Sequence, residues 1–325
     1  MINVTLRQLR YFEALARLGH FGRAADSCAI SQPALSMQIK EMEEELGGAL
    51  LERGARQVVL TGLGTELATR ARAILCAVDE LGDVARVSRD RLAGALRIGM
   101  IPTVAPYLLP AIIHSLSTAH PELDIRVREA LTSTLLQELG DGRLDTAIVA
   151  LPLSERTLTE VSLFKENFLF VRPSADADQP VPDPDRLRQM RLLLLEEGHC
   201  FRDQALAFCH MHNPRADALD ASSLSTLVQM VGAGIGVTLI PEMALAVESR
   251  AAPVAVARFP NPQPCRTIGM VWRKTTPLAA QLLQVAATVR QAATRASSNS
   301  KAPVGKSTAA GHGRTARKPR KASEK

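Results

Sequence analysis

Two cysteines, Cys200 and Cys209, lie nine positions apart in a stretch that also carries histidine, arginine and aspartate. An ionised thiol is a nucleophile toward oxidants, so this pair could do thiol redox chemistry. Cys200 follows a short apolar run and Gly198, and the residues after it have a helical pattern. We therefore predict that Cys200 lies at a strand-to-helix junction, where backbone N–H groups, the helix dipole, His199 and Arg202 favour a thiolate and lower its pKa.

The helix predicted after Cys200 decides what the two thiols can do together. Its apolar face carries Phe201, Ala205 and Phe208, and Arg202 and Asp203 lie off that face. Along an intact helix the two cysteine Cα atoms are about 13 Å apart, whereas a disulfide requires about 7 Å or less. The pair is therefore either inert or a switch that requires this segment to refold.

The composition is typical of a soluble globular protein of two or three domains. The chain has 325 residues, of which 46% are hydrophobic and 22% charged. It has no apolar run long enough to cross a membrane, and its charged N-terminus does not resemble a signal peptide. Five cysteines, an odd number, argue against a secreted disulfide scaffold. We therefore predict a cytoplasmic protein without a membrane partner.

The net charge of +6 comes from the C-terminal end. From Ser297 onward there are eight basic residues and one acid, which leaves a net charge of −1 on the rest of the chain. Residues 296–325 lack apolar periodicity and are predicted to be disordered. This tail resembles basic nucleic-acid-binding extensions, and the alternative is that it only increases solubility.

The first sixty residues read as three short helices. Leu6 to Leu18 carry an apolar helical stripe that ends at Gly19, and a second helix covers residues 21–28. Ser31 is a good N-cap for a third helix that ends near Leu46. Two helices joined by a tight turn, with small polar residues outward on the second, are typical of a helix-turn-helix that reads the major groove of DNA. The alternative is an ordinary three-helix core.

Residues 62–91 are predicted to form one long helix. Leu60, Leu67, Ile74 and Leu81 recur every seven positions, as in a coiled-coil seam. A single helix cannot bury such a seam, so we expect a dimer, unless the seam packs on its own domain. Cys76 lies off the seam and reads as a structural residue.

From residue 92 to 295 the pattern is that of an α/β domain. Strands are expected at 96–100, 124–130 and 144–151, with helices at 106–119 and 135–139 between them, which predicts parallel strands. A second half continues through 168–171, 192–195, 225–231, 237–240 and 267–272, and a last helix covers 277–295. Crossings near 165 and 266 predict two lobes, with a ligand cleft between them.

Several motifs of the chain, in this order, resemble those of LysR-type transcriptional regulators. They are residues 6–12, 24–25, 31–36, 39, 46–47, 51–53 and 60–64. The resemblance implies a winged helix-turn-helix domain (all-α with a small β wing) at 1–61, a dimerising linker helix at 62–91, and a two-lobed, periplasmic-binding-protein-like effector domain at 92–295. It also implies a homodimer or homotetramer that binds near-palindromic double-stranded DNA and RNA polymerase, and that is not an enzyme. The DNA-contacting residues implied are Phe21, Ala24, Ser31, Gln32, Pro33, Ser36, Gln38, Lys40, Arg53 and Thr61.

Residues 198–204 together with Cys209 are similar to the hydrogen-peroxide-sensing members of this family. The same members are also similar to this chain at residues 101–104, 106–110, 129–132 and 266–269. The resemblance implies that Cys200 is the peroxidatic cysteine, that Cys209 resolves its sulfenic acid as a reversible disulfide, and that the chain controls antioxidant genes. The peroxide pocket implied consists of Thr103, Thr132, His199, Asp203 and Arg266.

Two other functions remain open from the residues themselves. The chain could be a regulator that binds a small organic effector in the interlobe cleft, with inert cysteines. It could also be a metal sensor or a thiol enzyme, because His199, His210 and His212 accompany the two cysteines. The nine-residue cysteine spacing differs from the short spacings of structural zinc sites. We therefore expect no metal and no cofactor.

Overall fold

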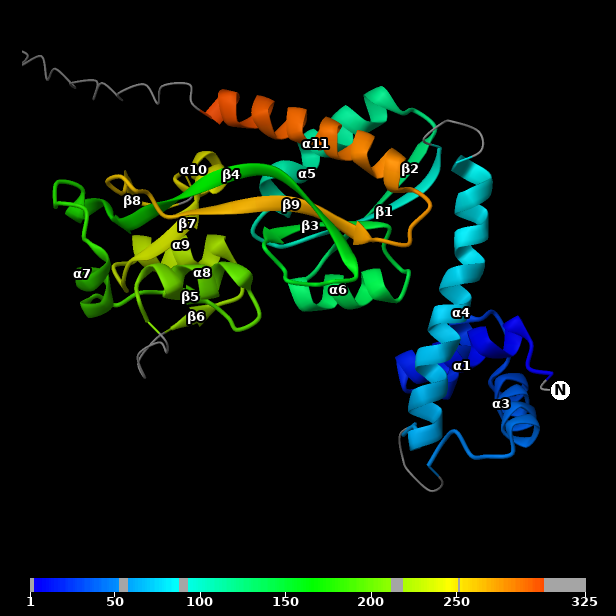
Figure 1. Ribbon diagram of the computed structural model, residues 1–325. Coiled ribbons are helices and arrows are strands. Elements are labelled where there is room, and N and C mark those ends of the chain that lie inside the picture. The colour runs from blue at the N-terminus through cyan, green and yellow to red at the C-terminus, as the bar shows by residue number, and fades with distance from the viewer. Residues whose placement is uncertain (1–2, 53–57, 88–92, 212–218, 251, 301–325) are drawn as a thin grey trace, which may run out of the picture.

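The computed structural model describes residues 3–52, 58–87, 93–211, 219–250 and 252–300. The N-terminal unit contains α1 (Leu6–Leu18), α2 (Phe21–Ser27) and α3 (Gln32–Leu46) (Figure 1). Thr5 and Gln8 form a capping box at the start of α1, and Gly19 ends it with φ 61°. The Ser31 hydroxyl accepts the Ala34 N–H at the start of α3. All three predicted helices are thus confirmed, and a bridge between Leu51 and Leu60 forms the base of the wing.

Helix α4 (Gly62–Val87) is the predicted linker helix. Its first half is anchored on the N-terminal core, where Ala68 and Ala71 are buried. Further along, Ile74 and Leu81 remain 46% and 68% exposed. The chain's own domain therefore does not cover the whole seam. The predicted end of the helix, residues 88–91, lies outside the described residues.

The effector domain is built on a seven-stranded sheet with the strand order β2-β1-β3-β9-β4-β7, and β8 pairs with β4. Its strands are β1 (Gly94–Met100), β2 (Leu123–Glu129), β3 (Thr146–Leu151), β4 (Leu158–Pro173), β7 (Thr238–Pro241), β8 (Val254–Arg258) and β9 (Cys265–Arg273). Strands β1, β2 and β3 are parallel as predicted, but β9, β4, β7 and β8 pair antiparallel. The sheet as a whole is therefore mixed, because β4 and β9 run in opposite directions between the lobes.

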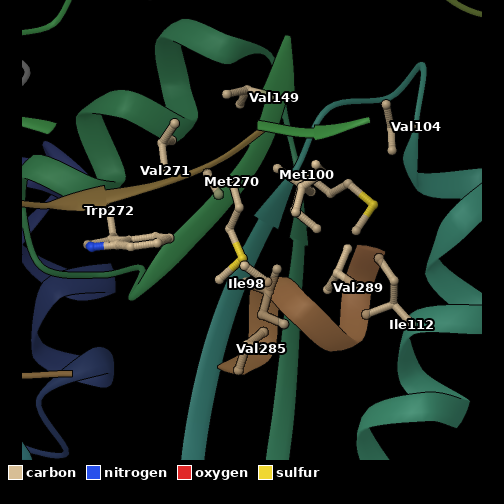
Figure 2. Packing of buried hydrophobic residues seen from close by; sticks show 14 of the residues in the cluster. Ile98, Met100, Val104, Ile112, Val149, Met270, Val271, Trp272, Val285 and Val289 are labelled. Atoms are coloured by element: carbon tan, nitrogen blue, oxygen red, sulfur yellow. The ribbon is translucent and has the colours of Figure 1, made fainter. Parts of the chain in front are cut away.

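Each lobe has its own hydrophobic core. In the first lobe α5 (Ala105–Ala119) and α11 (Ala279–Ser300) pack on the sheet, and α6 (Thr132–Gly140) lies beside β3. Figure 2 shows this core, with Ile98, Met100, Ile112, Met270, Trp272, Val285 and Val289. The second core contains the last part of β4, α7 (Pro184–Gln189), α8 (Cys200–Phe208), α9 (Leu224–Gly232), α10 (Leu245–Glu248), and the small sheet of β5 (Leu194–Leu195) and β6 (Asp220–Ala221).

The long strands β4 and β9 join the two lobes side by side (Figure 1). The predicted crossings near 165 and 266 fall within them. No described helix is long and apolar enough to cross a lipid bilayer.

Candidate functional site

Cys200 is the first residue of α8 and follows the buried strand β5 after the turn of residues 196–199. Gly198 makes the turn between them with φ 92°, a conformation that favours glycine. A side chain at this position would also crowd Leu131. The predicted strand-to-helix junction is confirmed, and His199 is the buried N-cap residue of the helix.

Arg266, on β9, is held rigidly beside Cys200. Its Nη1 donates to the Thr103 hydroxyl at 2.8 Å, and Nη2 donates to the Thr103 carbonyl at 3.2 Å. Its Nε lies 2.7 Å from Glu166 Oε1, so the guanidinium is paired with a buried carboxylate. The guanidinium also lies over the Phe201 ring, 5.1 Å from its centroid. These contacts fix a positive charge against the start of α8.

Thr132, the first residue of α6, lies on the other side of the thiol. Its hydroxyl oxygen is buried and has no hydrogen-bond partner of good geometry among the described residues, yet it lies near enough to Cys200 to favour the ionised form. A buried hydroxyl without a partner is unusual in proteins. It leaves a hydrogen-bonding group free beside the sulfur.

Burial raises the pKa of the Cys200 thiol, and Arg266 and Thr132 only partly oppose this effect. The predicted lowering of this pKa by the helix start was thus wrong. Burial also lowers the pKa of His199, which favours its neutral form. Arg202 is buried, contrary to the prediction, and it pairs with Asp220 at 2.8 Å instead of facing the thiol. The charge that stabilises a thiolate therefore comes from Arg266.

The structure brings together four of the predicted site residues, which are Cys200, Thr103, Thr132 and Arg266. His199 adjoins them through the chain. Asp203 is exposed at the solvent edge of α8, and its carboxylate raises the pKa of Cys200. Glu166 was not predicted from the sequence, because no local pattern shows that it lies against Arg266, a hundred positions away.

Cys209 follows the last residue of α8, is fully buried, and is not disulfide-bonded. The intervening helix is regular, so the two thiols are too far apart to bond without a rearrangement. After Cys209, His210 adopts φ 52°, a left-handed conformation that costs roughly 1 kcal/mol for a residue other than glycine. Phe201 packs on Phe168 and Phe208 on Phe259, with ring centroids 4.9 and 5.0 Å apart.

Burial raises the pKa of Cys209 to about 11, from an ordinary value of 9.0. The folded state therefore favours the neutral thiol, and this contribution to stability is complete below pH 9 and is lost as the pH rises toward 11. Between these limits we expect the free energy of unfolding of the reduced protein to fall by up to about 2.7 kcal/mol more than that of Cys209→Ala. Urea unfolding over a pH series measures the difference. Parallel curves would show that folding does not raise the pKa of Cys209.

The other three cysteines lie elsewhere. Cys28 is half-buried in the N-terminal unit, and Cys76 is half-buried on α4. Cys265 is exposed and precedes Arg266. Among the residues that the structure describes, no three His, Cys, Asp or Glu side chains come together as a metal site.

The candidate DNA-binding face is the first half of α3. Ser31, Gln32, Pro33, Ser36 and Lys40 are exposed. Met37, which was not among the predicted contacts, is 56% exposed on the same helix. The second half carries acidic side chains, so phosphate groups would repel it and the first half would enter the groove.

Four other predicted DNA contacts differ from this pattern. Ala24 is completely buried, so its side chain cannot contact DNA; the sequence alone did not show that α2 packs this face into the core. Phe21 packs partly against the same core, and the Gln38 amide donates to Glu41 at 2.6 Å. The Thr61 hydroxyl donates to the Ala49 carbonyl at 2.8 Å. Arg53 lies outside the described residues.

Comparisons with known proteins agree with this architecture. Residues 6–65 match the bacterial regulatory helix-turn-helix protein model of the lysR family, and residues 89–294 match the LysR substrate binding domain. The chain therefore belongs to the LysR family of bacterial transcriptional regulators. Within that family it groups with the OxyR proteins, as its relatives show.

The DNA-binding transcriptional dual regulator OxyR of Escherichia coli is 43% identical over 292 residues, which cover 88% of this chain and 95% of that protein. A probable hydrogen peroxide-inducible genes activator of Streptomyces viridosporus is 42% identical, over 89% of this chain and 94% of its own length. Among solved structures, full-length OxyR of Pseudomonas aeruginosa superimposes with a TM-score of 0.71 at 35% identity, over 89% of this chain and 95% of that one. A hydrogen-peroxide-bound mutant of Corynebacterium glutamicum OxyR superimposes with a TM-score of 0.63 at 34% identity, over 91% of this chain and 94% of that one.

Proposed function

We propose that this chain is a DNA-binding transcriptional regulator that senses hydrogen peroxide through a reversible Cys200–Cys209 disulfide and controls antioxidant genes. The observation that carries the proposal is a half-buried thiol between a fixed guanidinium and a hydroxyl that has no hydrogen-bond partner of good geometry among the described residues, on a helix that ends next to a second, buried thiol. The relatives named above support it, since solved OxyR structures include an oxidized form at 33% identity and a reduced form at 39%. The domain limits 1–61, 62–91, 92–295 and 296–325 are part of the proposal.

The chemistry needs no cofactor. The Cys200 thiolate attacks one oxygen of hydrogen peroxide, the O–O bond breaks, and the other oxygen leaves as hydroxide and takes up a proton to become water. Arg266 stabilises the negative charge throughout, and the free hydroxyl of Thr132 is available to the peroxide. The Cys209 sulfur then displaces the sulfenic oxygen, which leaves as water, and the disulfide forms. Cellular thiols reverse the reaction, so the protein is a switch and not an enzyme.

Outside the thiol site, the proposal places the protein in the cytoplasm as a homodimer or homotetramer. The exposed apolar side chains of α4, including Ile74 and Leu81, support association with a second copy. Two copies would present two α3 helices to a near-palindromic site in double-stranded DNA. RNA polymerase is the partner expected of an activator at a promoter.

Thiol titration and peptide mapping, before and after peroxide treatment of the whole chain, test the proposed function. We expect peroxide to consume two thiols and to link the peptides that contain Cys200 and Cys209. Reduction by a dithiol should release them. Two unchanged free thiols at these positions would contradict the proposal.

Replacing Thr132 by valine separates reactivity from stability. Within the described parts of the chain the hydroxyl has no hydrogen-bond partner of good geometry, so its loss should leave the melting temperature unchanged or slightly higher. The rate of peroxide reaction should fall about tenfold, because one hydrogen bond to a charged group is worth about 1.5 kcal/mol or more. Stopped-flow kinetics and thermal denaturation measure the two effects.

The matched control is Thr146→Val, because the buried hydroxyl of Thr146 donates to the Val271 carbonyl at 2.9 Å. We expect it to lose stability and keep its peroxide rate. If both variants reacted with peroxide at the wild-type rate, Thr132 would have no part in the chemistry.

A further inference from the structure

The linker helix α4 contacts the effector domain at the turn between α6 and β3, residues 141–144. Arg72 Nη1 lies 3.4 Å from Asp141 Oδ1, and Arg143 pairs with the same carboxylate. The next residue, Gly142, adopts φ 72° and lies against Cys76. A Cβ atom at Gly142 would be only 2.6 Å from the Cys76 Sγ atom. The turn therefore fits closely against one side of α4.

Arg273, near the end of β9, binds both sides of this contact. Its Nη1 donates to the carbonyl groups of Leu139 and Leu144, and its Nη2 lies 3.5 Å from Glu80 Oε1 on α4. The side chains of Arg273 and Glu80 are mostly buried, with 12% and 23% of their surface exposed. We call the contacts of Arg72, Cys76 and Glu80 with Asp141, Gly142 and Arg273 the linker junction.

Two regular elements lead from the thiol site to the linker junction. Helix α6 begins at Thr132, beside Cys200, and ends at Gly140, next to the junction turn. Strand β9 carries Arg266 at its start and Arg273 at its end. A packed helix and a strand paired on both sides move as units more readily than they deform. A displacement at Cys200 thus has two direct mechanical connections to α4.

We propose that the linker junction transmits the redox state of Cys200 to the DNA-binding unit, by holding α4 at the angle that belongs to the reduced state. This inference rests on the proposed function. When α8 rearranges, Arg266 and Thr132 lose their packing against it, and the start of β9 and of α6 can shift. The ion pairs at the far ends then change partners or distance, which alters the angle of α4.

The test compares two double variants of the full chain that remove one ion-pairing charge of each sign from α4. Arg72→Gln/Glu80→Gln removes the α4 side of the linker junction. The control, Arg70→Gln/Glu66→Gln, removes an exposed pair on the same helix, 2.9 Å apart, with side chains 75% and 64% exposed. For each protein, DNA affinity is measured in the reduced and the disulfide form on a duplex selected from a random pool by the wild type.

For each protein we compare the DNA affinity of the reduced form with that of the disulfide form. We expect the difference between the two forms to shrink at least fivefold in Arg72→Gln/Glu80→Gln, the junction variant, and to stay unchanged in the control, Arg70→Gln/Glu66→Gln. Peroxide should still form the disulfide in both. Because linkage is reciprocal, DNA should shift the redox potential of the wild-type pair by about 30 mV per tenfold affinity ratio, and by less in the junction variant. An unchanged ratio in the junction variant, or a wild-type ratio of one with the disulfide formed, overturns the inference. Absence of the disulfide would instead overturn the proposed function.

A steric variant tests the same contact without changing charge. Gly142→Ala introduces a Cβ 2.6 Å from the Cys76 Sγ atom, at a backbone with φ 72° that any side chain strains, and should uncouple the two states like the double variant. The backbone strain is the same with and without Cys76, so the next comparison isolates the contact with the sulfur. Adding Cys76→Ala to that chain removes the sulfur and should restore at least half of the affinity ratio. Full coupling in Gly142→Ala would also count against the proposal.

Discussion

A chain in which Cys200 is replaced by serine should no longer respond to hydrogen peroxide. A serine hydroxyl has almost the same size as a thiol, but it does not ionise near neutral pH and cannot displace hydroxide from peroxide. We expect a loss of at least about 1,000-fold in the rate of peroxide consumption, equivalent to about 4 kcal/mol. The reduced-state DNA affinity should remain within twofold of wild type. Peroxide kinetics and footprinting before and after oxidation measure these effects.

Cys209→Ser is the matched control for this variant, because it removes the second thiol and keeps the first. It should still form a sulfenic acid on Cys200, detectable with a dimedone-type probe, but no stable oxidised state. Oxidised wild type should instead show a new footprint and altered protease cleavage between about residues 196 and 225. If both thiols stayed free while transcription responded to peroxide, a small organic effector in the cleft would become the better explanation.

A carboxylate at position 36 should abolish specific DNA binding. Ser36 is exposed on the first half of α3, and glutamate there would place a negative charge against the phosphates and base edges of the groove. We expect at least about a 100-fold loss of affinity for the selected duplex, or about 2.7 kcal/mol. The fold should be intact, because the side chain has no buried contacts.

Net charge alone could weaken binding, so Gln284→Glu is the control for Ser36→Glu. Gln284 is exposed on α11 in the effector domain, and the substitution adds the same charge there. It should change affinity by less than twofold. Wild-type affinity in Ser36→Glu would show that this face of α3 does not enter the groove.

Local signals determined most of the fold. Gly19 and Ser31 end and begin helices through contacts within a few residues, so their roles were readable from the sequence. Strand β4 was recognised only at Phe168–Val171, because its first half alternates between buried and exposed side chains and lacks a continuous apolar run. Strands β6 and β8 were not predicted, since the first is two residues long and the second is only half-buried.

The thiol site was predictable as a set of residues but not as an electrostatic environment. The predicted lowered pKa of Cys200 came from its position at a helix start, which is a local property. The pKa of Cys200 is in fact raised, because burial of the thiol outweighs the opposing charge of Arg266. That residue is 66 positions away in the sequence, so no local pattern reveals it. Arg202 shows the same limit, because it is buried on α8 and its partner Asp220 lies on strand β6, 18 positions further along the chain.

The short sheet of β5 and β6 has a consequence for how a refolding event is sensed. Leu194 pairs with Asp220 and Leu195 with Ala221, so the stretch that carries α8 begins and ends on neighbouring strands, about 4.8 Å apart. Both thiols lie between these two strands, so the stretch that carries them has fixed ends. We expect a rearrangement of α8 to leave these two paired strands in place. The conformation of this stretch therefore affects the rest of the protein through side-chain packing. Phe201 and Phe208 pack on Phe168 and Phe259, and Arg266 and Thr132 lie beside the start of α8. The sensor segment could be exchanged between relatives as a cassette only together with these contacts.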